Sequence, residues 1–460
     1  MSNRNNHDEN QAVAFTTWKT LPLGVVQKIF LLTCIPCHRH YEKCRHLGCG
    51  TPYALILGKV CRAWREVAWS TPELWQWIDI TVSRAGYKAP EDAETQLQLL
   101  RDWLQRAQNQ LLSITVRPEK GYGNYTVTGP TGPVAVVKVL ADYSMQWKEL
   151  NMYCPDECTQ VLNAVRGRVP FLESFTVNTS GMIIPGTTLD FLADAPSLRS
   201  LDCAAMRLGQ EGNIWPRLTR LRAYGRTKEV ANVLRFAPNV EYCRLEVLEH
   251  SFGSEEQGQL PSDAPTIFLQ NLTNLAVRHC SSMKILSHIA APSLQRLSVI
   301  QDSFPFPFQT LNDFIDRSHC KLRAFGLAVA FPLDVEGLRT LFSKSDTITR
   351  LYIGSKKASD FQTLMRKIPK MLDPDFAADE GVLLPNLQIF YYSTVDPVRS
   401  EEMVNMIKSR WSQRWPGVEK LRTVRFKETN LKILLDPLKD EIQQGLEVTY
   451  DLPYKGEPFE

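Results

Sequence analysis

The group of side chains best suited to metal chemistry lies between residues 34 and 49. This stretch carries four cysteines and three histidines, namely Cys34, Cys37, Cys44, Cys49, His38, His40 and His46. Thiolate and imidazole ligands at short spacing suit a structural zinc ion, for which Cys37, Cys44, Cys49 and His46 are the candidate ligands. The alternative is a solvated, metal-free loop, because the spacing matches no common zinc finger. A catalytic Cys–His pair is a third option, but nothing in the adjacent sequence indicates a pocket.

Two apolar helical segments must position this loop. In the first, Thr20 can cap the helix and Pro22 fits the first turn, where no backbone donor is needed. Its apolar residues recur at helical spacing and are Val25, Val26, Ile29, Phe30 and Leu32. A second helix is expected from about Pro52 to Ser70, with an apolar face of Tyr53, Ile56, Leu57, Val60, Trp64, Val67 and Ala68. Leu74, Trp75 and Ile78 follow and can pack back onto both helices.

A helical module this small buries little surface and is marginally stable alone. Its many Trp and Leu side chains indicate that a partner completes part of the apolar face. The alternative is that the module is only the N-terminal cap of the domain that follows.

Several short runs in this module carry a family resemblance. They are Leu21-Pro22, Ile29-Phe30, the Val60-Cys61-Arg62-x-Trp64-Arg65 run and Thr71-Pro72-x-Leu74-Trp75. Together they resemble the F-box family, in particular fungal F-box-like proteins with a divergent repeat domain. The resemblance covers about residues 18 to 80, with a Cys/His-rich insertion at 37–50. Gly24 stands where that family usually has Glu.

The F-box resemblance implies a binding role in which the chain itself performs no bond chemistry. Modules of that family dock onto the Skp adaptor of Skp–cullin–F-box ubiquitin ligases, and the adaptor pairs with a cullin. The implied adaptor-binding residues are Leu21, Pro22, Val25, Ile29, Phe30, Leu57, Val60, Trp64 and Val67. Physically, such a site is an apolar helix face in a partner's groove. Some of these residues also form the module's own core.

Residues 81–146 are expected to connect the helical module to the rest of the chain. Leu97, Leu100, Trp103 and Leu104 predict a helix over 93–109, and a strand is expected over 111–116. Glycines and prolines over 121–133 predict a loop. The Gly-Tyr-Gly run within it is no phosphate loop, because no Lys-Ser or Lys-Thr follows.

Over residues 147–453 a short phrase recurs, apolar-x-x-apolar-x-apolar, often with Pro two residues before it. Its equivalent positions are Leu150, Phe175, Leu201, Leu221, Cys243, Leu275, Leu297, Phe325, Leu351, Phe390 and Val424. Most steps between them are 20 to 28 residues. This period predicts an irregular leucine-rich-repeat solenoid of the α/β class, with parallel strands on the concave face and helices or turns on the convex face. The alternative is an unrelated α/β domain.

Helical spacing between the expected strands supports the repeat prediction. It occurs over 187–192, 228–236, 310–316, 335–343 and 361–368. In each strand, alternate side chains leave the core and face the concave side. Those positions carry mostly arginine and tyrosine: Arg220, Arg222, Tyr224, Tyr242, Arg244, Arg278, Arg296, Arg350, Tyr352 and Tyr391. Such a face suits an acidic or phosphorylated protein segment, and the alternative is a solvated surface of paired charges in which Asp202 and Glu246 take part.

Composition narrows the functional classes that remain open for this chain. The chain has 460 residues and a net charge of +3, which gives no overall argument for membrane or nucleic-acid binding. No apolar run approaches the roughly 18–20 residues of a spanning helix, and no secretory signal is evident. We therefore expect a cytoplasmic or nuclear protein with reduced cysteines and loose tails at 1–17 and 454–460.

The resulting functional prediction is the substrate-recognition subunit of a Skp–cullin–F-box ubiquitin ligase, with no cofactor other than the possible zinc. The alternative is a non-catalytic leucine-rich-repeat scaffold without that role. No nucleophile elbow, zinc-protease motif or Walker loop indicates an enzyme. Nucleic-acid binding would rest only on the arginines.

Overall fold

The structure is a computed structural model of the 460-residue chain. It describes residues 21–33, 53–82, 90–118, 132–153, 156–178, 188–204, 214–247, 260–261, 264–278, 283–301, 306–329, 334–355, 362–376, 381–393, 401–427 and 436–451. The predicted tails and the Cys/His-rich insertion lie outside these ranges. The described residues form a mixed α/β protein with a long parallel sheet of 14 strands and 12 α-helices, which confirms the predicted class.

The chain divides into two compact units, residues 1–161 and 162–460, and each is described by itself. The first unit contains α1 (Leu23–Thr33), α2 (Tyr53–Val60), α3 (Arg62–Trp69), β1 (Trp77–Val82), α4 (Pro90–Ala107), β2 (Leu112–Pro118), α5 (Pro133–Ala141) and β3 (Trp147–Tyr153). Its strands pair in parallel in the order β1-β2-β3. The N-terminal helical part is therefore shorter than the expected 18–80, because the parallel sheet already begins at Trp77.

The single helix expected over 52–70 is two helices that meet at Cys61. Cys61 has extended backbone angles, and its sulfur accepts a hydrogen bond from the Trp64 amide at 3.5 Å, which starts α3. The two helices approach closely at Gly58, where a Cβ atom would lie 2.1 Å from the Trp69 ring. The side chain of Arg65 also donates to the Gly58 carbonyl at 2.9 Å. The apolar periodicity continues through Cys61, so the sequence pattern gave no sign of this break.

Trp75 joins these helices to the rest of the first unit. It is fully buried, and its indole nitrogen donates to the Ala68 carbonyl at 2.9 Å. Its own carbonyl accepts from the indole of Trp103 in α4 at 2.8 Å. Leu74 and Ile78 are buried beside it, so the prediction that this segment packs back onto the helices is confirmed.

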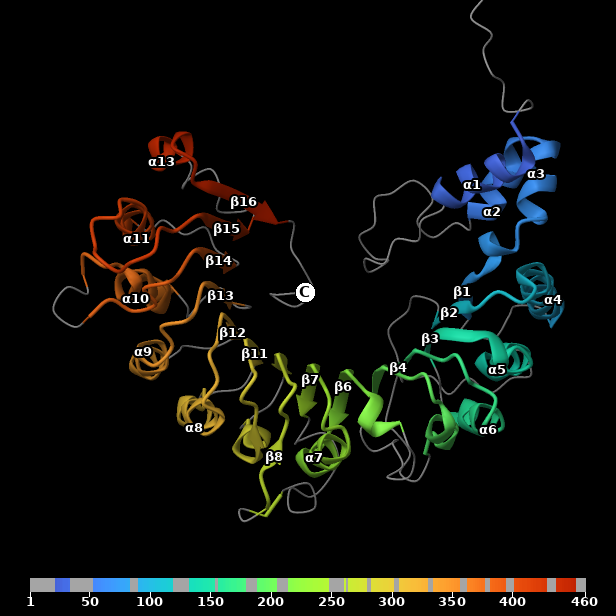
Figure 1. The fold of residues 1–460 in the computed structure, drawn as a ribbon, viewed down its shortest axis with the longest axis horizontal. Helices are drawn as coiled ribbons and strands as arrows, with labels where there is room; N and C mark the ends of the chain where they lie inside the picture. The colour runs from blue at the N-terminus through green and yellow to red at the C-terminus, as the bar shows by residue number, and fades with distance from the viewer. Residues whose placement is uncertain are drawn as a thin grey trace, which may run out of the picture. The chain divides into compact units, whose positions relative to one another are not determined.

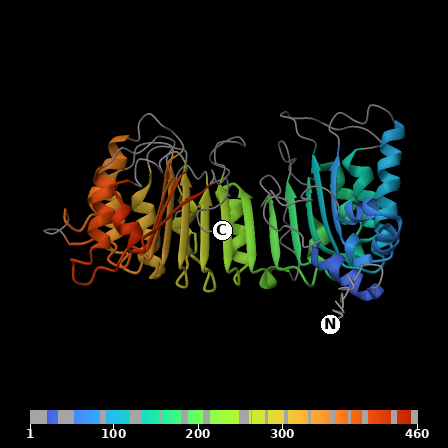
Figure 2. The same cartoon turned by 90° about the horizontal axis from the view of Figure 1, so that it is seen from above.

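The second unit repeats a strand followed by a helix or turn. It contains β4 (Ser174–Asn178), β5 (Ser200–Ala204), β6 (Arg220–Gly225), α7 (Thr227–Phe236), β7 (Tyr242–Val247), β9 (Asn274–Arg278), β11 (Arg296–Gln301), α8 (Phe308–Ser318), β12 (Ala324–Val329), α9 (Val335–Ser343), β13 (Arg350–Ser355), α10 (Gln362–Leu372), β14 (Ile389–Ser393), α11 (Glu401–Trp411), β15 (Thr423–Lys427), α13 (Lys439–Gln443) and β16 (Glu447–Asp451). A separate two-stranded pair joins β8 (Ile267–Phe268) to β10 (Ile289–Ala290), and α6 (Thr159–Asn163) lies at the boundary of the units. Within this unit the helices α7 to α13 lie on the outer side of the strands (Figure 1), which run side by side in one direction (Figure 2).

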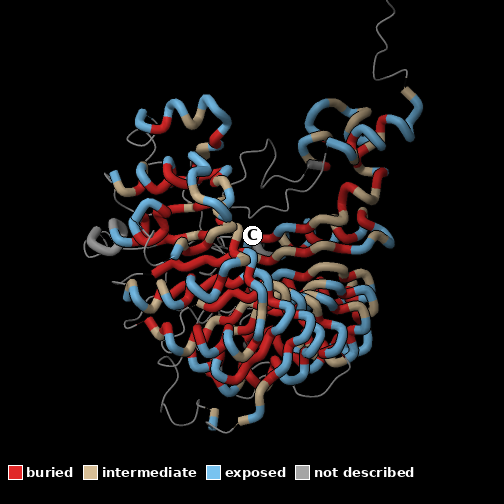
Figure 3. The backbone as a smooth tube through the Cα atoms, turned by 60° about the vertical axis from the view of Figure 1, so that its left-hand side comes forward, coloured by how far each residue is buried: buried red, intermediate tan, exposed pale blue. Residues whose placement is uncertain are grey.

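The strand register confirms the predicted repeat positions of this unit. In neighbouring strands, the paired residues are Phe175, Leu201, Leu221, Cys243, Leu275, Leu297, Phe325, Leu351, Phe390 and Val424. Every one of them is at most 2% exposed. They form one continuous apolar row between the sheet and the outer helices, and the buried colour follows the strands in Figure 3.

Polar side chains tie several repeats to the one before. Each donor is the residue just before the first apolar position of the recurring phrase; it follows Pro at Ser197, Asn239 and Asn386 and follows Asp346 at Thr347, and the acceptors are backbone carbonyls of the preceding repeat. The bonds run from Ser197 to Pro170 (2.7 Å), from Asn239 to Pro216 (2.8 Å), from Thr347 to Leu322 (2.7 Å) and from Asn386 to Asp346 (2.8 Å). The phrase therefore carries the link between neighbouring repeats as well as the apolar core.

A buried arginine, Arg410 in α11, connects three segments of the second unit. Its side chain is 1% exposed and donates to the carbonyls of Leu372, Leu383 and Leu384 at 2.8, 2.6 and 3.0 Å. Leu384 has a φ of 50°, a left-handed conformation that costs a leucine roughly 1 kcal/mol or more. Asp373, which follows α10 directly, lies beside this arginine and is only 2% exposed.

Most predicted helices of the second unit are present. The segments expected over 228–236, 310–316, 335–343 and 361–368 correspond to α7, α8, α9 and α10. The segment expected over 187–192 instead forms a short 3-10 helix at Asp190–Asp194. None of the helices in the described ranges combines the length and apolarity needed to cross a lipid bilayer.

Candidate interaction sites

The N-terminal helices have one packed side and one side that faces solvent. Phe30 of α1 is 1% exposed, and its ring lies 4.9 Å from the ring of Trp64 in α3. Val26 is buried on the same side of α1. These contacts fix α1 on α3 and leave the opposite side of α1 outward.

The outward side of α1 is apolar. Val25, Ile29 and Leu32 follow at spacings of four and three residues, so they share one helix face, and they are 43%, 43% and 63% exposed. On α2, Ile56 and Val60 also share a face and are 37% and 59% exposed. Exposed apolar side chains concentrated on two short helices are a feature that interaction surfaces share.

The residues implied as adaptor-binding divide into three groups. Pro22, Val25, Ile29 and Val60 are exposed, Leu21, Leu57, Trp64 and Val67 are half-buried, and Phe30 is buried in the core. Leu23, Leu32 and Ile56 are exposed too, although the resemblance did not single them out. The helical spacing of Leu32 and Ile56 was a signal available in the sequence.

The proposed zinc ligands lie outside the described residues. Cys37, Cys44, Cys49 and His46 all fall within 34–52, where the structure describes nothing. Within the ranges that it does describe, no cluster of His, Cys, Asp and Glu could hold a metal ion.

The second unit carries the predicted arginine and tyrosine residues on one side of its strands. We call this side the arginine face, defined by the side chains of β6, β7, β9, β11, β13 and β14 that alternate with the buried core positions. Arg220, Arg296 and Arg350 are exposed, whereas Arg222, Tyr224, Tyr242, Arg244, Arg278, Tyr352 and Tyr391 are half-buried. The alternation of core and polar residues that predicted this face in the sequence is therefore present in the strands, where these side chains lie on one side of the sheet.

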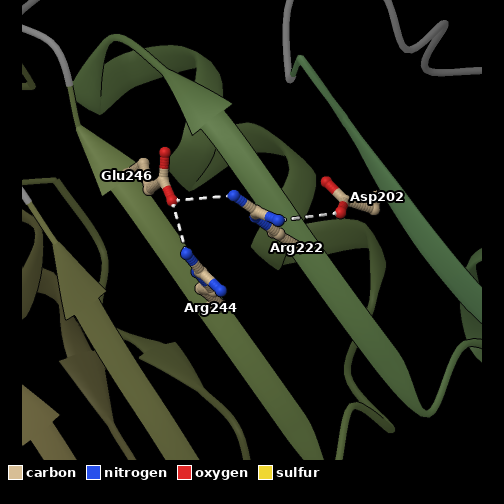
Figure 4. A network of polar contacts seen from close by, with 4 residues as sticks. All are labelled: Asp202, Arg222, Arg244 and Glu246. Atoms are coloured by element: carbon tan, nitrogen blue, oxygen red, sulfur yellow. Dashed lines mark hydrogen bonds and ion pairs between the residues drawn. The ribbon is translucent and has the colours of Figure 1, made fainter. Parts of the chain in front are cut away.

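Part of the arginine face is internally neutralised. Arg222 of β6 lies between two carboxylates, 3.2 Å from Asp202 on β5 and 3.0 Å from Glu246 on β7. Glu246 also pairs with Arg244 at 3.0 Å, so the four side chains form one chain of ion pairs across three strands (Figure 4). Arg222 and Arg244 are therefore paired with carboxylates, as the alternative prediction of a surface of paired charges expected.

Burial and pairing act differently on the two acids of this chain of ion pairs. Burial raises the pKa of Asp202 to about 6, against the opposing effect of Arg222. Burial also acts to raise the pKa of Glu246, but Arg222 and Arg244 together hold it below its usual value. Glu246 is therefore the better compensated carboxylate, because it has two cationic partners.

Aromatic contacts organise the rest of the arginine face. The guanidinium of Arg220 lies 5.1 Å from the centre of the Tyr242 ring. Tyr352 and Tyr391 stack with their ring centres 4.7 Å apart and their planes 16° from parallel. Such rigid aromatic and arginine side chains are the types that dominate protein interfaces.

Both surfaces have the chemistry of binding sites, one apolar and one cationic with aromatic rings. Comparison with known protein families and with curated proteins found no match to this chain.

Proposed function

We propose that this chain is a non-catalytic substrate receptor of a ubiquitin ligase of the Skp–cullin–F-box class. In this proposal the helices α1 to α3 dock onto the Skp adaptor. The second unit is an irregular leucine-rich-repeat solenoid that binds a protein substrate and holds it near the ubiquitin-charged enzyme. The single observation that carries the proposal is the outward apolar stripe of Val25, Ile29 and Leu32 on a helix whose other side is packed.

The helical module fits an adaptor-docking role for a physical reason. Its core is closed by Phe30, Trp64 and Trp75, so the exposed apolar residues are not needed to hold it together. Apolar surface left in water gains roughly 25 cal/mol per Å² when a partner covers it. An adaptor groove that accepts α1 and α2 would supply that cover.

The position of Gly24 is compatible with this role. Gly24 is exposed, and a Cβ atom added there would meet nothing within 4 Å. The usual Glu of the family would therefore fit at this place, and its absence leaves the packing of α1 unchanged. The glycine weakens the isolated helix by roughly 0.5–1 kcal/mol relative to alanine.

The repeated architecture of the second unit supports a substrate-binding role. Parallel strands in register, separated mostly by 20 to 28 residues, give a continuous face that a long protein segment can follow. Arginines outnumber carboxylates along that face, which favours an acidic or phosphorylated substrate.

The test is co-purification of the full chain with a Skp adaptor and a cullin. Val25→Glu combined with Ile29→Glu places two charges in the proposed interface, and we expect at least about tenfold weaker adaptor binding. The matched control is Leu99→Glu on α4, because Leu99 is 62% exposed and apolar but lies outside α1 to α3. Point variants are preferable to a truncation at residue 81, which would remove most of β1.

Two outcomes would reject the proposal. One is a wild-type chain that captures proteins but never an adaptor, which would favour the scaffold alternative. The other is equal loss of adaptor binding in the Leu99→Glu control, which would show that the effect does not depend on the stripe.

A further inference from the structure

A lysine stands within the outward apolar face of α1. Lys28 lies three residues after Val25 and four before Leu32, so it shares their side of the helix. It is exposed, as are the apolar side chains of Val25, Ile29 and Leu32 around it. The packed residue Phe30 lies on the other side of the helix. A partner that covers the apolar stripe therefore also covers the base of the Lys28 side chain.

The outward side of α2 repeats this arrangement. Lys59 lies three residues after Ile56 and directly before Val60, and all three side chains are exposed. Ala54 and Gly58 lie on the other side of this helix and are buried. The order apolar-x-x-Lys-apolar thus occurs in both helices, and each of them presents a lysine flanked by apolar side chains.

The positive charge of these helices is not balanced within them. Helices α1 and α2 contain no Asp or Glu. Together α1 to α3 carry four cationic side chains and one carboxylate, Glu66, which pairs with Arg62 on α3 at 3.3 Å. The outward sides of α1 and α2 are therefore apolar and positively charged at once.

This combination restricts the chemistry of the partner. An ammonium group that is covered by an apolar surface without a counter-charge loses its hydration at high cost. Lys28 can extend its ammonium group toward the rim of a contact, but its place between Val25 and Leu32 keeps its aliphatic stem inside. A groove that accepts α1 must therefore offer a carboxylate within reach of Lys28.

We infer that the outward faces of α1 and α2 bind a protein whose apolar groove carries carboxylates, one opposite Lys28 and one opposite Lys59. This inference rests on the proposed function, since it states the chemistry of the adaptor surface that the two helices contact. The lysines also accelerate the encounter, because opposite charges raise the association rate. A protein groove is favoured over an anionic lipid surface because helices that lie on lipid keep their cations on the polar face, whereas Lys28 stands in the middle of the apolar one.

The test removes the charge and keeps an unbranched apolar side chain. Binding of a purified Skp adaptor to the immobilised full chain is measured by biolayer interferometry at about 0.1 M salt. We expect Lys28→Met to weaken binding at least about tenfold and Lys59→Met about threefold to tenfold, because each leaves a carboxylate of the groove without its cation. Lys28→Arg keeps the charge and should bind within about threefold of the wild type.

The sign of the Lys28→Met effect decides between two kinds of groove. A purely apolar groove would bind this variant more tightly than the wild type, so equal or tighter binding overturns the inference. An association rate that stays constant when the salt rises from about 0.05 to about 0.3 M also overturns it. The matched control is Lys138→Met, because Lys138 is an exposed lysine on α5, outside α1 to α3. Equal loss of binding in this control would show that the effect is not local.

Two further outcomes separate the inference from its alternatives. Co-sedimentation with vesicles of phosphatidylserine and phosphatidylcholine that is lost in Lys28→Met, together with unchanged adaptor binding, would overturn the inference in favour of a lipid surface. A wild-type chain that binds no adaptor rejects the proposed function and the inference together, whereas adaptor binding that is insensitive to both lysines rejects the inference alone.

Discussion

Replacing Arg410 by Met should weaken the second unit at the place where α10, α11 and β14 meet. The guanidinium donates to three backbone carbonyls, those of Leu372, Leu383 and Leu384. Met resembles the unbranched aliphatic part of the arginine side chain but has no donor, so the three carbonyls lose their partner in a buried site. One of them belongs to a residue in the left-handed conformation, which the arginine helps to hold.

The expected loss in the free energy of unfolding follows from two opposing contributions. Each hydrogen bond from a charged donor contributes about 1.5–3 kcal/mol, so three of them represent roughly 4.5–9 kcal/mol. Burial lowers the pKa of Arg410 to about 10, although Asp373 opposes the shift. The lowered pKa corresponds to roughly 3 kcal/mol of desolvation that Met would recover. We therefore expect the free energy of unfolding to fall by about 2–6 kcal/mol.

Urea unfolding followed by tryptophan fluorescence measures this change, since Trp411 and Trp415 report on the same region. The control is Arg414→Met, an exposed arginine just beyond α11, for which we expect a change within about 0.5 kcal/mol. An Arg410→Met chain with the unfolding midpoint of the wild type would refute the reasoning, because it would mean that the three carbonyls find other donors at no cost.

Two further predictions concern packing and pH. Gly58→Ala should destabilise the first unit by about 1–3 kcal/mol, because its Cβ would collide with the Trp69 ring, whereas Gly24→Ala should stabilise α1 by about 0.5–1 kcal/mol. Thermal unfolding by circular dichroism measures both, and equal melting temperatures for the two variants would contradict the prediction. Burial raises the pKa of Asp202 to about 6, so the folded chain binds this proton more tightly than the unfolded chain and loses stability as the pH rises from about 4 to about 6. Asp202→Asn should therefore be more stable than the wild type at pH 7.5 by about 1–3 kcal/mol and equal to it below pH 4; a lower urea midpoint at pH 7.5 would show that pairing with Arg222 outweighs burial.

The core of the second unit could be predicted because its apolar phrase repeats with little variation. Aligning Leu221, Cys243 and Leu275 by the phrase places them in the register that the strands adopt. The outer helices α7 to α10 were visible for the same reason. Helix α11 was missed, although Met403, Met406 and Ile407 have helical spacing and acidic residues open the helix.

Tertiary contacts account for what the sequence did not reveal. The break at Cys61 depends on the close approach of Gly58 and Trp69, which the uninterrupted apolar periodicity conceals. The pairing of Arg222 with Asp202 and Glu246 depends on strand register. Aligning the recurring phrases places Arg222 opposite Asp202 and diagonal to Glu246, so the sequence contained a signal for these ion pairs. Residue type alone indicated only a basic face.

The hydrogen bonds between successive repeats have a consequence for how the second unit opens. A repeat in the middle of the row, such as the one with Asn239, both gives a bond to its predecessor and sits between two packed neighbours. Opening it breaks two interfaces, whereas opening a terminal repeat breaks one. Within the second unit, amide hydrogens should therefore exchange with solvent fastest in β16, which is an edge strand of the sheet, and more slowly in strands such as β9 and β11 that are paired on both sides.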